Sequence, residues 1–324
     1  MNILITTAPF GKENITPIQL LDKENAKYFI NPYGRKLSEK ELIDLVPEFD
    51  IIIAGTEKIG IDVFNAARSL KLISRVGVGL DGIDLVAAKK NNVLISYTPD
   101  APAPAVAELT LGLTYSLIRN IHMANVDMHR SLWKRYFGKR LCDCKIGIIG
   151  VGRIGNKVAN LYAANGAQTI LLNDLKVDQD KFNKFQWVDK EIIYKDADII
   201  TLHLPYTNIT KDLIGAKELS MMKPEAVIIN TARGGIINEN ALIQALKDKM
   251  IHGAAIDVFE NEPYVGELSQ LDNCILTAHM GSMSKDCRAK MEIEATEEAI
   301  RYLRGDPLKN LIPDFYFQSD LVHE

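Results

Sequence analysis

The sequence has few cysteines, few aromatic residues and little excess of either charge. Its 324 residues include 4 cysteines, and aromatic side chains make up 7% of the chain. Cys142 and Cys144 form the only close pair, and two thiolates do not complete the four ligands of a structural zinc site. Because neither a disulfide framework nor a metal pattern is present, we expect reduced thiols, a cytoplasmic protein and no metal.

Long apolar runs and targeting segments are also lacking. No run approaches the roughly 20 apolar residues that span a bilayer. The first seven residues contain no basic cluster of the kind that begins a signal peptide. A formal net charge of −4 and a pI near 5.9 disfavour a nucleic-acid surface. We therefore expect neither a membrane nor a nucleic acid as a partner.

The most informative stretch is residues 145–174, which reads as strand, glycine turn, helix and strand. Gly150, Gly152 and Gly155 form a G-x-G-x-x-G pattern, and Asp174 follows the last glycine by about 20 residues. The first glycine permits a tight turn, the second lets a diphosphate approach the backbone, and the third lets the helix pack on the strand. Asp174 can accept hydrogen bonds from ribose hydroxyls and would repel a 2′-phosphate. The stretch therefore predicts binding of NAD.

Alternating apolar runs and helical patterns predict an α/β protein with two parallel sheets. In the first hundred residues the expected strands are Asn2–Thr6, Asp50–Ala54, Leu72–Val76 and Val93–Tyr97, and the expected helices are Ser38–Leu45, Gly60–Ala67 and Leu85–Lys90. Later expected strands are Lys145–Ile149, Thr169–Leu172, Ile199–Leu204, Ala226–Asn230, Gly253–Val258 and Ile275–Thr277. One long helix is expected over Ala105–His129, and another from Ser284 to Arg304.

The tail 308–324 is too short to be a domain, so we expect it to return to the first hundred residues. The predicted fold is therefore two Rossmann-like, doubly wound parallel-sheet domains. A discontinuous substrate-binding (catalytic) domain comprises residues 1–99 and 290–324, and an NAD-binding Rossmann domain comprises residues 100–289. Ligands of such sheets bind at the carboxyl ends of the strands.

Three polar side chains are expected at that edge of the NAD-binding domain. Arg233, Glu262 and His279 each follow a predicted strand. An arginine can hold a carboxylate through two parallel bonds, and a histidine oriented by an acid can move a proton near neutral pH. Singly, each residue has an ordinary structural explanation. Together, beside a nicotinamide, they suit hydride transfer between a 2-hydroxy acid and a 2-oxo acid.

Glycines also follow the third strand of the first domain, in the segment Arg75–Asp84. Their exposed amides suit a small anion, although a glycine turn that merely ends a strand is the structural alternative.

These patterns resemble the D-isomer-specific 2-hydroxyacid dehydrogenases over nearly the whole chain. The matching motifs are Arg75–Asp84, Ala105–Leu109, Gly150–Gly155, His203–Thr210, Met222–Pro224, Asn230–Gly235, Asp257–Pro263 and His279. The chain is most similar to the phosphoglycerate dehydrogenase and glyoxylate/hydroxypyruvate reductase branches. The resemblance implies an NAD-dependent oxidoreductase that acts on a D-2-hydroxy acid/2-oxo acid pair.

The resemblance also implies a role for individual residues. Arg233, Glu262 and His279 would be catalytic. The amides of Val78 and Gly79, with Arg75 and Arg233, would bind the substrate. The implied cofactor-binding residues are Gly150, Gly152, Arg153, Ile154, Gly155, Asp174, Leu204, Thr231, Ala232, Asp257 and Gly281. Relatives assemble through their NAD-binding domains, which implies a homodimer or homotetramer and gives Trp133 the place of an arm residue that reaches the neighbouring subunit.

Three alternatives stay open. The substrate could be 3-phosphoglycerate, but the loop 54–58 contains no arginine and carries an acid, Glu57. An NADH-sensing, corepressor-like binding protein would keep the same catalytic residues, although no basic surface run supports it. Formate dehydrogenases resemble this fold but pair the histidine with glutamine. Gly82 and Ala278 depart from the asparagine and proline that are usual in the family.

Overall fold

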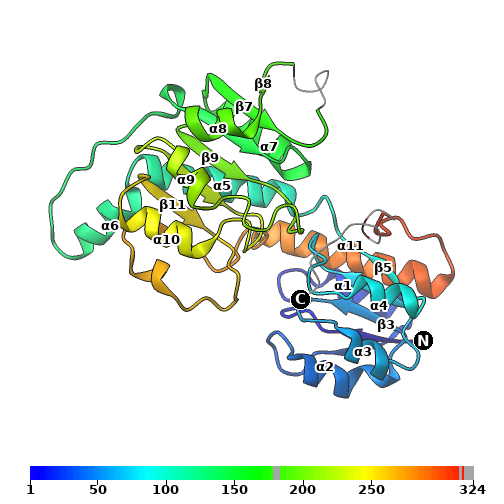
Figure 1. Cartoon of the computed structure of the whole chain (residues 1–324). Coiled ribbons are helices and arrows are strands. Elements are labelled where there is room, and N and C mark those ends of the chain that lie inside the picture. The colour runs from blue at the N-terminus through cyan, green and yellow to red at the C-terminus, as the bar shows by residue number, and fades with distance from the viewer. Residues whose placement is uncertain (178–182, 314–315, 317–324) are drawn as a thin grey trace. The chain divides into compact units, whose positions relative to one another are not determined.

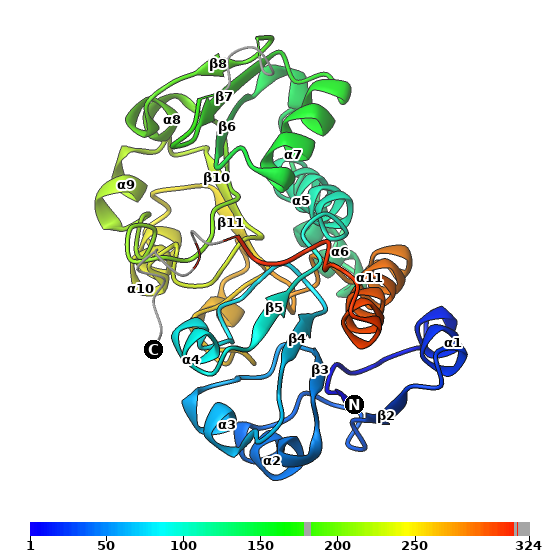
Figure 2. The ribbon, with the colours of Figure 1, turned by 90° about the vertical axis from the view of Figure 1, so that its right-hand side faces the viewer.

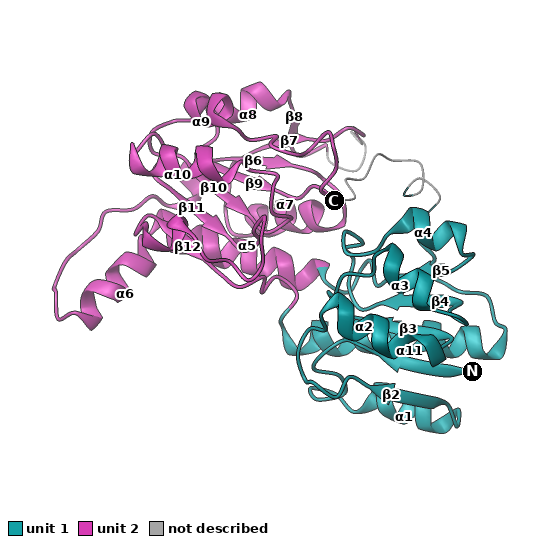
Figure 3. Cartoon of the chain, turned by 60° about the horizontal axis from the view of Figure 1, so that its bottom comes forward, with its two compact units in different colours: residues 1–102, 283–324 teal, residues 103–282 magenta. Residues whose placement is uncertain are grey.

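The computed structural model describes residues 1–177, 183–313 and 316. The chain forms two compact units (Figure 3): unit 1 comprises residues 1–102 and 283–324, and unit 2 comprises residues 103–282. The sequence placed the boundaries at 99/100 and 289/290. Helix α11 (Lys285–Arg304) is continuous and lies wholly in unit 1, so a boundary at 289/290 would divide one hydrogen-bonded element.

Unit 1 is a sheet of five parallel strands in the order β2-β1-β3-β4-β5. The strands are β1 (Asn2–Ile5), β2 (Lys27–Ile30), β3 (Ile51–Ala54), β4 (Leu72–Arg75) and β5 (Leu94–Ser96). The helices, besides α11, are α1 (Thr16–Lys23), α2 (Glu39–Leu45), α3 (Ile61–Ala66) and α4 (Leu85–Lys90), with a short 3₁₀ turn at Val46–Glu48. Helix α1 and strand β2 were not predicted, because β2 is a largely exposed edge strand and α1 buries only two side chains.

Helices cover both faces of this sheet. Helices α2, α3 and α4 pack on one face, where they contribute Leu42, Phe64 and Leu85 to one buried apolar cluster. Helix α11 lies on the other face, where Ser74 Oγ donates to the carbonyl of Ala295 at 2.8 Å. The tail returns to this unit as expected, because the Ile312 amide donates to the Ile95 carbonyl at 3.0 Å. The remainder of the expected tail, 314–315 and 317–324, lies outside the described residues.

Unit 2 contains seven parallel strands in the order β12-β11-β10-β9-β6-β7-β8. The strands are β6 (Lys145–Ile149), β7 (Thr169–Asn173), β8 (Gln186–Trp187), β9 (Ile199–Leu202), β10 (Val227–Asn230), β11 (Gly253–Ile256) and β12 (Cys274–Leu276). The helices are α5 (Ala103–Ile118), α6 (Ile121–His129), α7 (Arg153–Ala164), α8 (Lys190–Asp196), α9 (Ala216–Met221) and α10 (Glu239–Lys247), with 3₁₀ turns at Leu141–Asp143 and Glu267–Gln270. Among these strands, only the two-residue β8 was not expected.

Helices α5 and α7 cover one face of this sheet, and α8, α9 and α10 cover the other (Figures 1 and 2). Strands β6 and β9 are neighbours although β7 and β8 lie between them in the chain. The order of connections therefore reverses between β6 and β9, which is where doubly wound sheets bind their ligands. The predicted α/β class with two doubly wound parallel sheets is confirmed.

The prediction of a single helix over Ala105–His129 is wrong. The structure has two helices, separated at Asn120, whose φ of 51° is left-handed. Asparagine tolerates this conformation, and its side-chain amide donates to the Phe137 carbonyl at 3.0 Å. This bond closes the base of an excursion, residues 121–137, which we call the arm. Helix α6, within the arm, has no buried residue and projects from unit 2 (Figures 1 and 3).

Candidate active site

The glycine turn between β6 and α7 has the geometry that a dinucleotide diphosphate requires. Gly150 has a φ of +92°, and a Cβ there would lie 2.3 Å from the His203 carbonyl oxygen. A Cβ on Gly155 would lie 1.9 Å from the Gly150 carbonyl oxygen, whereas a Cβ on Gly152 would meet no atom within 4 Å. The turn is therefore closed on two sides and open at Gly152.

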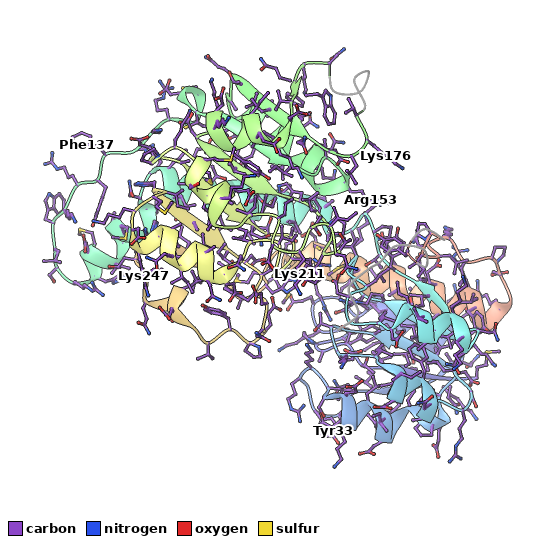
Figure 4. The ribbon with its side chains drawn as sticks, in the orientation of Figure 1. Tyr33, Phe137, Arg153, Lys176, Lys211 and Lys247 are labelled. Atoms are coloured by element: carbon purple, nitrogen blue, oxygen red, sulfur yellow. The ribbon has the colours of Figure 1, made fainter. Side chains whose placement is uncertain are left out.

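Helix α7 starts at this turn, at Arg153 (Figure 4). Its N-cap, Gly152, provides no side chain to accept the amide hydrogen bonds of the first turn. Ile154 follows in that first turn. The amides and the positive end of a 12-residue helix thus adjoin the open side of the turn, an arrangement that favours anions.

Asp174 lies immediately after β7 and contacts the same turn. Its Oδ2 accepts from the Val151 amide at 2.6 Å, and its Oδ1 accepts from the Lys176 amide at 3.1 Å. The acid expected to bind ribose is therefore held beside the turn by the turn's own backbone. No pattern in the sequence signals the contact with Val151, because it depends on how β6 and β7 align.

His203 is a residue of this edge to which the sequence analysis assigned no role. It follows β9, and its Nε2 lies 2.9 Å from Thr201 Oγ1. Its Nδ1 is buried and has no hydrogen-bond partner among the described residues. Burial lowers the pKa of His203 to about 3, so the ring is neutral at physiological pH. Leu204, the next residue, packs partly against the core of unit 2.

Arg233 lies in the loop after β10, and Asn230 shapes that loop. The Asn230 side chain accepts from the Ala232 amide at 3.0 Å and donates to the Arg233 carbonyl at 2.8 Å. Arg233 Nη1 donates to the Ala232 carbonyl at 2.7 Å. Thr231 and Ala232 are buried, and the Thr231 hydroxyl lies 2.9 Å from that of Thr110 on α5. The arginine is thus presented by a loop with its own internal bonds.

Asp257, directly after β11, organises the loop that follows β12. Its Oδ1 accepts from the Thr277 hydroxyl at 2.6 Å and from the Met280 amide at 2.7 Å, and its Oδ2 accepts from the Gly281 amide at 2.9 Å. Its backbone carbonyl accepts from the His279 amide at 2.8 Å. Burial raises the pKa of Asp257, and these hydrogen bonds oppose the rise. The side chain is fully buried, so its main visible role is to hold the His279 loop.

His279 and Glu262, two of the predicted catalytic side chains, are in direct contact. His279 Nδ1 lies 2.9 Å from Glu262 Oε2 and 3.1 Å from Oε1. Glu262 Oε1 also accepts from the Phe259 amide at 3.2 Å, which fixes the carboxylate. Because an ionised carboxylate only accepts, Nδ1 carries a proton and Nε2 is left for proton exchange. The side chains of His279 and Glu262 are 43% and 35% exposed, so the pair is accessible from solvent.

Unit 1 carries the predicted anion loop, which we define as residues 76–79 after β4. Among the described residues, no acceptor receives a hydrogen bond from the amide of Val78 or Gly79. Arg75 Nε donates to the Gly79 carbonyl at 3.0 Å, and its Nη1 donates to the Val76 carbonyl at 2.6 Å. The loop therefore has two available amides, while the arginine expected to bind substrate contacts the loop itself.

Glu57 lies at the carboxyl edge of the same sheet, with its carboxylate turned inward. Only 2% of the residue is exposed. Its Oε1 accepts from the Gly55 amide at 2.9 Å and from the Thr6 hydroxyl. Gly82 packs closely against the backbone of Glu57, because a Cβ on Gly82 would lie 2.9 Å from the Glu57 carbonyl oxygen. This contact accounts for glycine at position 82.

Two negative findings apply to the part of the chain that the structure describes. It contains no group of three His, Cys, Asp or Glu side chains placed to hold a metal ion. None of its helices has the length and apolar character needed to cross a bilayer.

Comparisons with known proteins agree with this architecture. The profile of the D-isomer specific 2-hydroxyacid dehydrogenase family, NAD binding domain, matches residues 111–281. The chain is 34% identical to a hydroxypyruvate reductase from Thermotoga maritima, over 87% of this chain and 96% of that protein. It is 37% identical to a D-3-phosphoglycerate dehydrogenase from a Synechocystis species, over 85% of this chain but 51% of that protein. It thus spans about half the length of that relative.

Among solved structures, the TT0316 protein from Thermus thermophilus superposes with a TM-score of 0.87 at 29% identity. The match covers 97% of this chain and 100% of that one.

Proposed function

Because the chain belongs to the D-isomer-specific 2-hydroxyacid dehydrogenases, we propose that it transfers a hydride between NAD(H) and a D-2-hydroxy acid/2-oxo acid pair. The observation that carries the proposal is the His279–Glu262 pair, at 2.9 Å, on the same sheet edge as the glycine turn. The turn fits the diphosphate, since it is open at Gly152, adjoins the start of α7 and is bordered by Asp174. A bound nicotinamide supplies the hydride acceptor or donor.

The residues of unit 2 supply the proton chemistry in this proposal. His279 Nε2 removes the hydroxyl proton in oxidation and returns it in reduction. Glu262 holds the ring through Nδ1 and stabilises its protonated form. Arg233 binds the substrate through its guanidinium, which can form parallel hydrogen bonds with a carboxylate.

The remaining assignments of unit 2 concern the cofactor. Asp257 is proposed to accept a hydrogen bond from the nicotinamide carboxamide. An ionised carboxylate has about four acceptor sites, and three hydrogen bonds from the loop leave one on Oδ2. Thr231, Ala232 and Leu204 are proposed to line the cofactor.

Unit 1 is proposed to recognise the substrate carboxylate through the amides of Val78 and Gly79. For the far end of the substrate we propose an uncharged group instead of a phosphate. The loop 54–58 offers no arginine, and the Glu57 carboxylate already accepts the hydrogen bonds of Gly55 and Thr6. Glu57 was expected to face the substrate, but its carboxylate is turned inward. The proposal of an unphosphorylated substrate therefore rests on the absence of an arginine in this loop.

The experiment is steady-state kinetics of NADH oxidation with glyoxylate, hydroxypyruvate and 3-phosphohydroxypyruvate. We expect turnover of the first two. A preference above about tenfold for the phosphorylated acid, roughly 1.4 kcal/mol in transition-state stabilisation, would overturn the assignment of an unphosphorylated substrate. Tight NADH binding with negligible turnover of every acid would contradict an enzyme and indicate a binding protein.

We further propose a homodimer or homotetramer formed through unit 2. The arm carries exposed apolar side chains, with Trp133 79% and Phe137 102% exposed, and it borders a cavity of about 280 Å³. Phe137 is labelled in Figure 4. An apolar surface of this kind is typical of a subunit interface. Light scattering should show an oligomer for the wild type and a smaller species for Trp133→Ser/Phe137→Ser. The four free cysteines suit the cytoplasm, which we propose as the location.

A further inference from the structure

The anion loop of unit 1 is held from one side by Thr98. The Gly77 amide donates to Thr98 Oγ1 at 2.8 Å, and the Gly77 carbonyl accepts from the Thr98 amide at 3.0 Å. Thr98 is fully buried, so both hydrogen bonds are shielded from solvent. Gly77 has a φ of +140°, which a side chain at this position would strain.

Arg75 holds the loop from the other side. Its guanidinium donates to the carbonyls of Val76 and Gly79 at 2.6 and 3.0 Å, and Nη1 also lies 3.4 Å from the Ala54 carbonyl at the end of β3. A Cβ on Gly77 would lie 3.3 Å from Nη1, so the guanidinium packs directly against the loop. One planar group thus ties the carbonyls of this loop to the neighbouring strand.

The orientation of the carbonyls determines what the loop presents. The carbonyls of Val76 and Gly79 are drawn to the guanidinium, while the amides of Val78 and Gly79 have no acceptor among the described residues. Two consecutive amides without an acceptor, beside a half-buried cation, can bind an anion.

We propose that Arg75 is a positioning residue for substrate binding. It shapes the anion loop so that the amides of Val78 and Gly79 receive the substrate carboxylate, and it does not itself contact the substrate. This role differs from the direct contact that the family resemblance implied. The inference rests on the proposed function, because it assigns the loop to a 2-oxo acid.

The chemistry of arginine explains why this residue suits the task. The guanidinium is planar and rigid, so its donors reach several carbonyls in fixed directions. A lysine keeps the charge but concentrates its donors at one flexible atom. Arg75→Lys therefore separates the positioning effect from the effect of charge.

The experiment compares Arg75→Lys and Thr98→Val with the wild type as full-length proteins. Binding of oxalate, a two-carbon carboxylate probe, is measured by calorimetry in the presence of NADH. KM and kcat are measured for glyoxylate, hydroxypyruvate and 3-phosphohydroxypyruvate. Hydrogen exchange of a peptide covering residues 76–80 is followed with and without oxalate. Lys58→Gln is the matched control, since Lys58 is 64% exposed and pairs with Glu39, and its substitution removes one positive charge near the same edge.

We expect Arg75→Lys and Thr98→Val to weaken oxalate binding and raise KM for every acid by a similar factor of about ten or more. The value of kcat should stay within about threefold of the wild type, because the proton and hydride chemistry belongs to other residues. Oxalate should slow exchange of the 76–80 peptide in the wild type and in Lys58→Gln, but much less in the other two variants.

Other results overturn the inference. Unchanged oxalate binding in Arg75→Lys would do so, as would an effect equal to that of Lys58→Gln. A KM rise confined to the phosphorylated acid would show that Arg75 contacts the substrate. If Arg75→Lys does not fold, Thr98→Val decides by the same criteria. Failure of the proposed function is distinguishable, because the wild type would then bind oxalate or NADH without turning over any 2-oxo acid.

Discussion

The two glycines Gly152 and Gly155 should respond in opposite ways to substitution by alanine. A Cβ on Gly155 would lie 1.9 Å from the Gly150 carbonyl oxygen and 3.0 Å from its carbonyl carbon, so the backbone must move to relieve the contact. Overpacking of this kind costs about 1–3 kcal/mol or more. Alanine is favoured over glycine inside a helix by at most about 1 kcal/mol. The clash therefore dominates, and Gly155→Ala should be destabilised.

Gly152→Ala is the matched control for folding. Its backbone, at φ −72° and ψ −151°, is open to any residue, and its Cβ would meet nothing within 4 Å. The free energy of unfolding should stay close to that of the wild type. The same open space is where we place the diphosphate, so the methyl group should raise the Kd for NADH at least tenfold, about 1.4 kcal/mol.

Thermal unfolding by circular dichroism and an NADH fluorescence titration measure the two effects. With a net cost of about 2 kcal/mol, Gly155→Ala should melt about 4–8 °C below the wild type, given about 2–4 °C per kcal/mol for a unit of this size. Gly152→Ala should melt with the wild type and bind NADH weakly. The reasoning is refuted if Gly155→Ala retains the wild-type melting temperature, or if Gly152→Ala binds NADH normally.

Three further predictions follow from the same edge of unit 2. Glu262→Gln should move the pH optimum of 2-oxo acid reduction downward, because a neutral amide no longer stabilises protonated His279; an unchanged pH–rate profile would show that the two are uncoupled. Wild-type catalytic efficiency should be higher with NADH than with NADPH, and Asp174→Ser should narrow that difference; equal efficiencies in the wild type would contradict the role of the acid. Burial lowers the pKa of His203 from 6.5 to about 3, so the unfolded chain binds a proton below pH 6.5 that the folded protein excludes. The contribution of neutral His203 to the free energy of unfolding is complete above pH 6.5. It declines toward pH 3 by up to about 1.4 kcal/mol per pH unit. The free energy of unfolding, measured with urea at about pH 7.5 and about pH 5, should therefore fall less toward acid for His203→Gln than for the wild type. An equal fall in both proteins would argue against a pKa of His203 lowered by burial.

Local patterns in the sequence were sufficient for most of the architecture. Apolar runs and glycine spacing predicted β6, the turn at Gly150–Gly155 and α7, because the residues of each segment carry the pattern of its own structure. The last helix was predicted at both ends for the same reason. Ser284 caps its start by accepting from the Cys287 amide, and Gly305 ends it in a left-handed conformation.

Elements that depend on distant contacts were missed or misread. The edge strand β2 has only a three-residue apolar run, Tyr28–Ile30, and most of it is exposed, so its pairing with β1 is what makes it a strand. The break between α5 and α6 at Asn120 depends on a hydrogen bond to Phe137, which lies beyond the helix. A helical pattern on both sides of that residue could not show it.

The same distinction between local pattern and distant contact applies to the candidate active site. Sequence motifs predicted Arg233, Glu262 and His279 as catalytic residues, because each follows a strand and parallel strands place their carboxyl ends at one edge. Tertiary structure decided what neighbouring side chains do there. Asp257 is bound to the His279 loop, and Arg75 to the carbonyls of its own loop. Spacing along the chain reports which residues reach an edge, but the direction of a charged side chain depends on which donors and acceptors the folded backbone leaves unsatisfied.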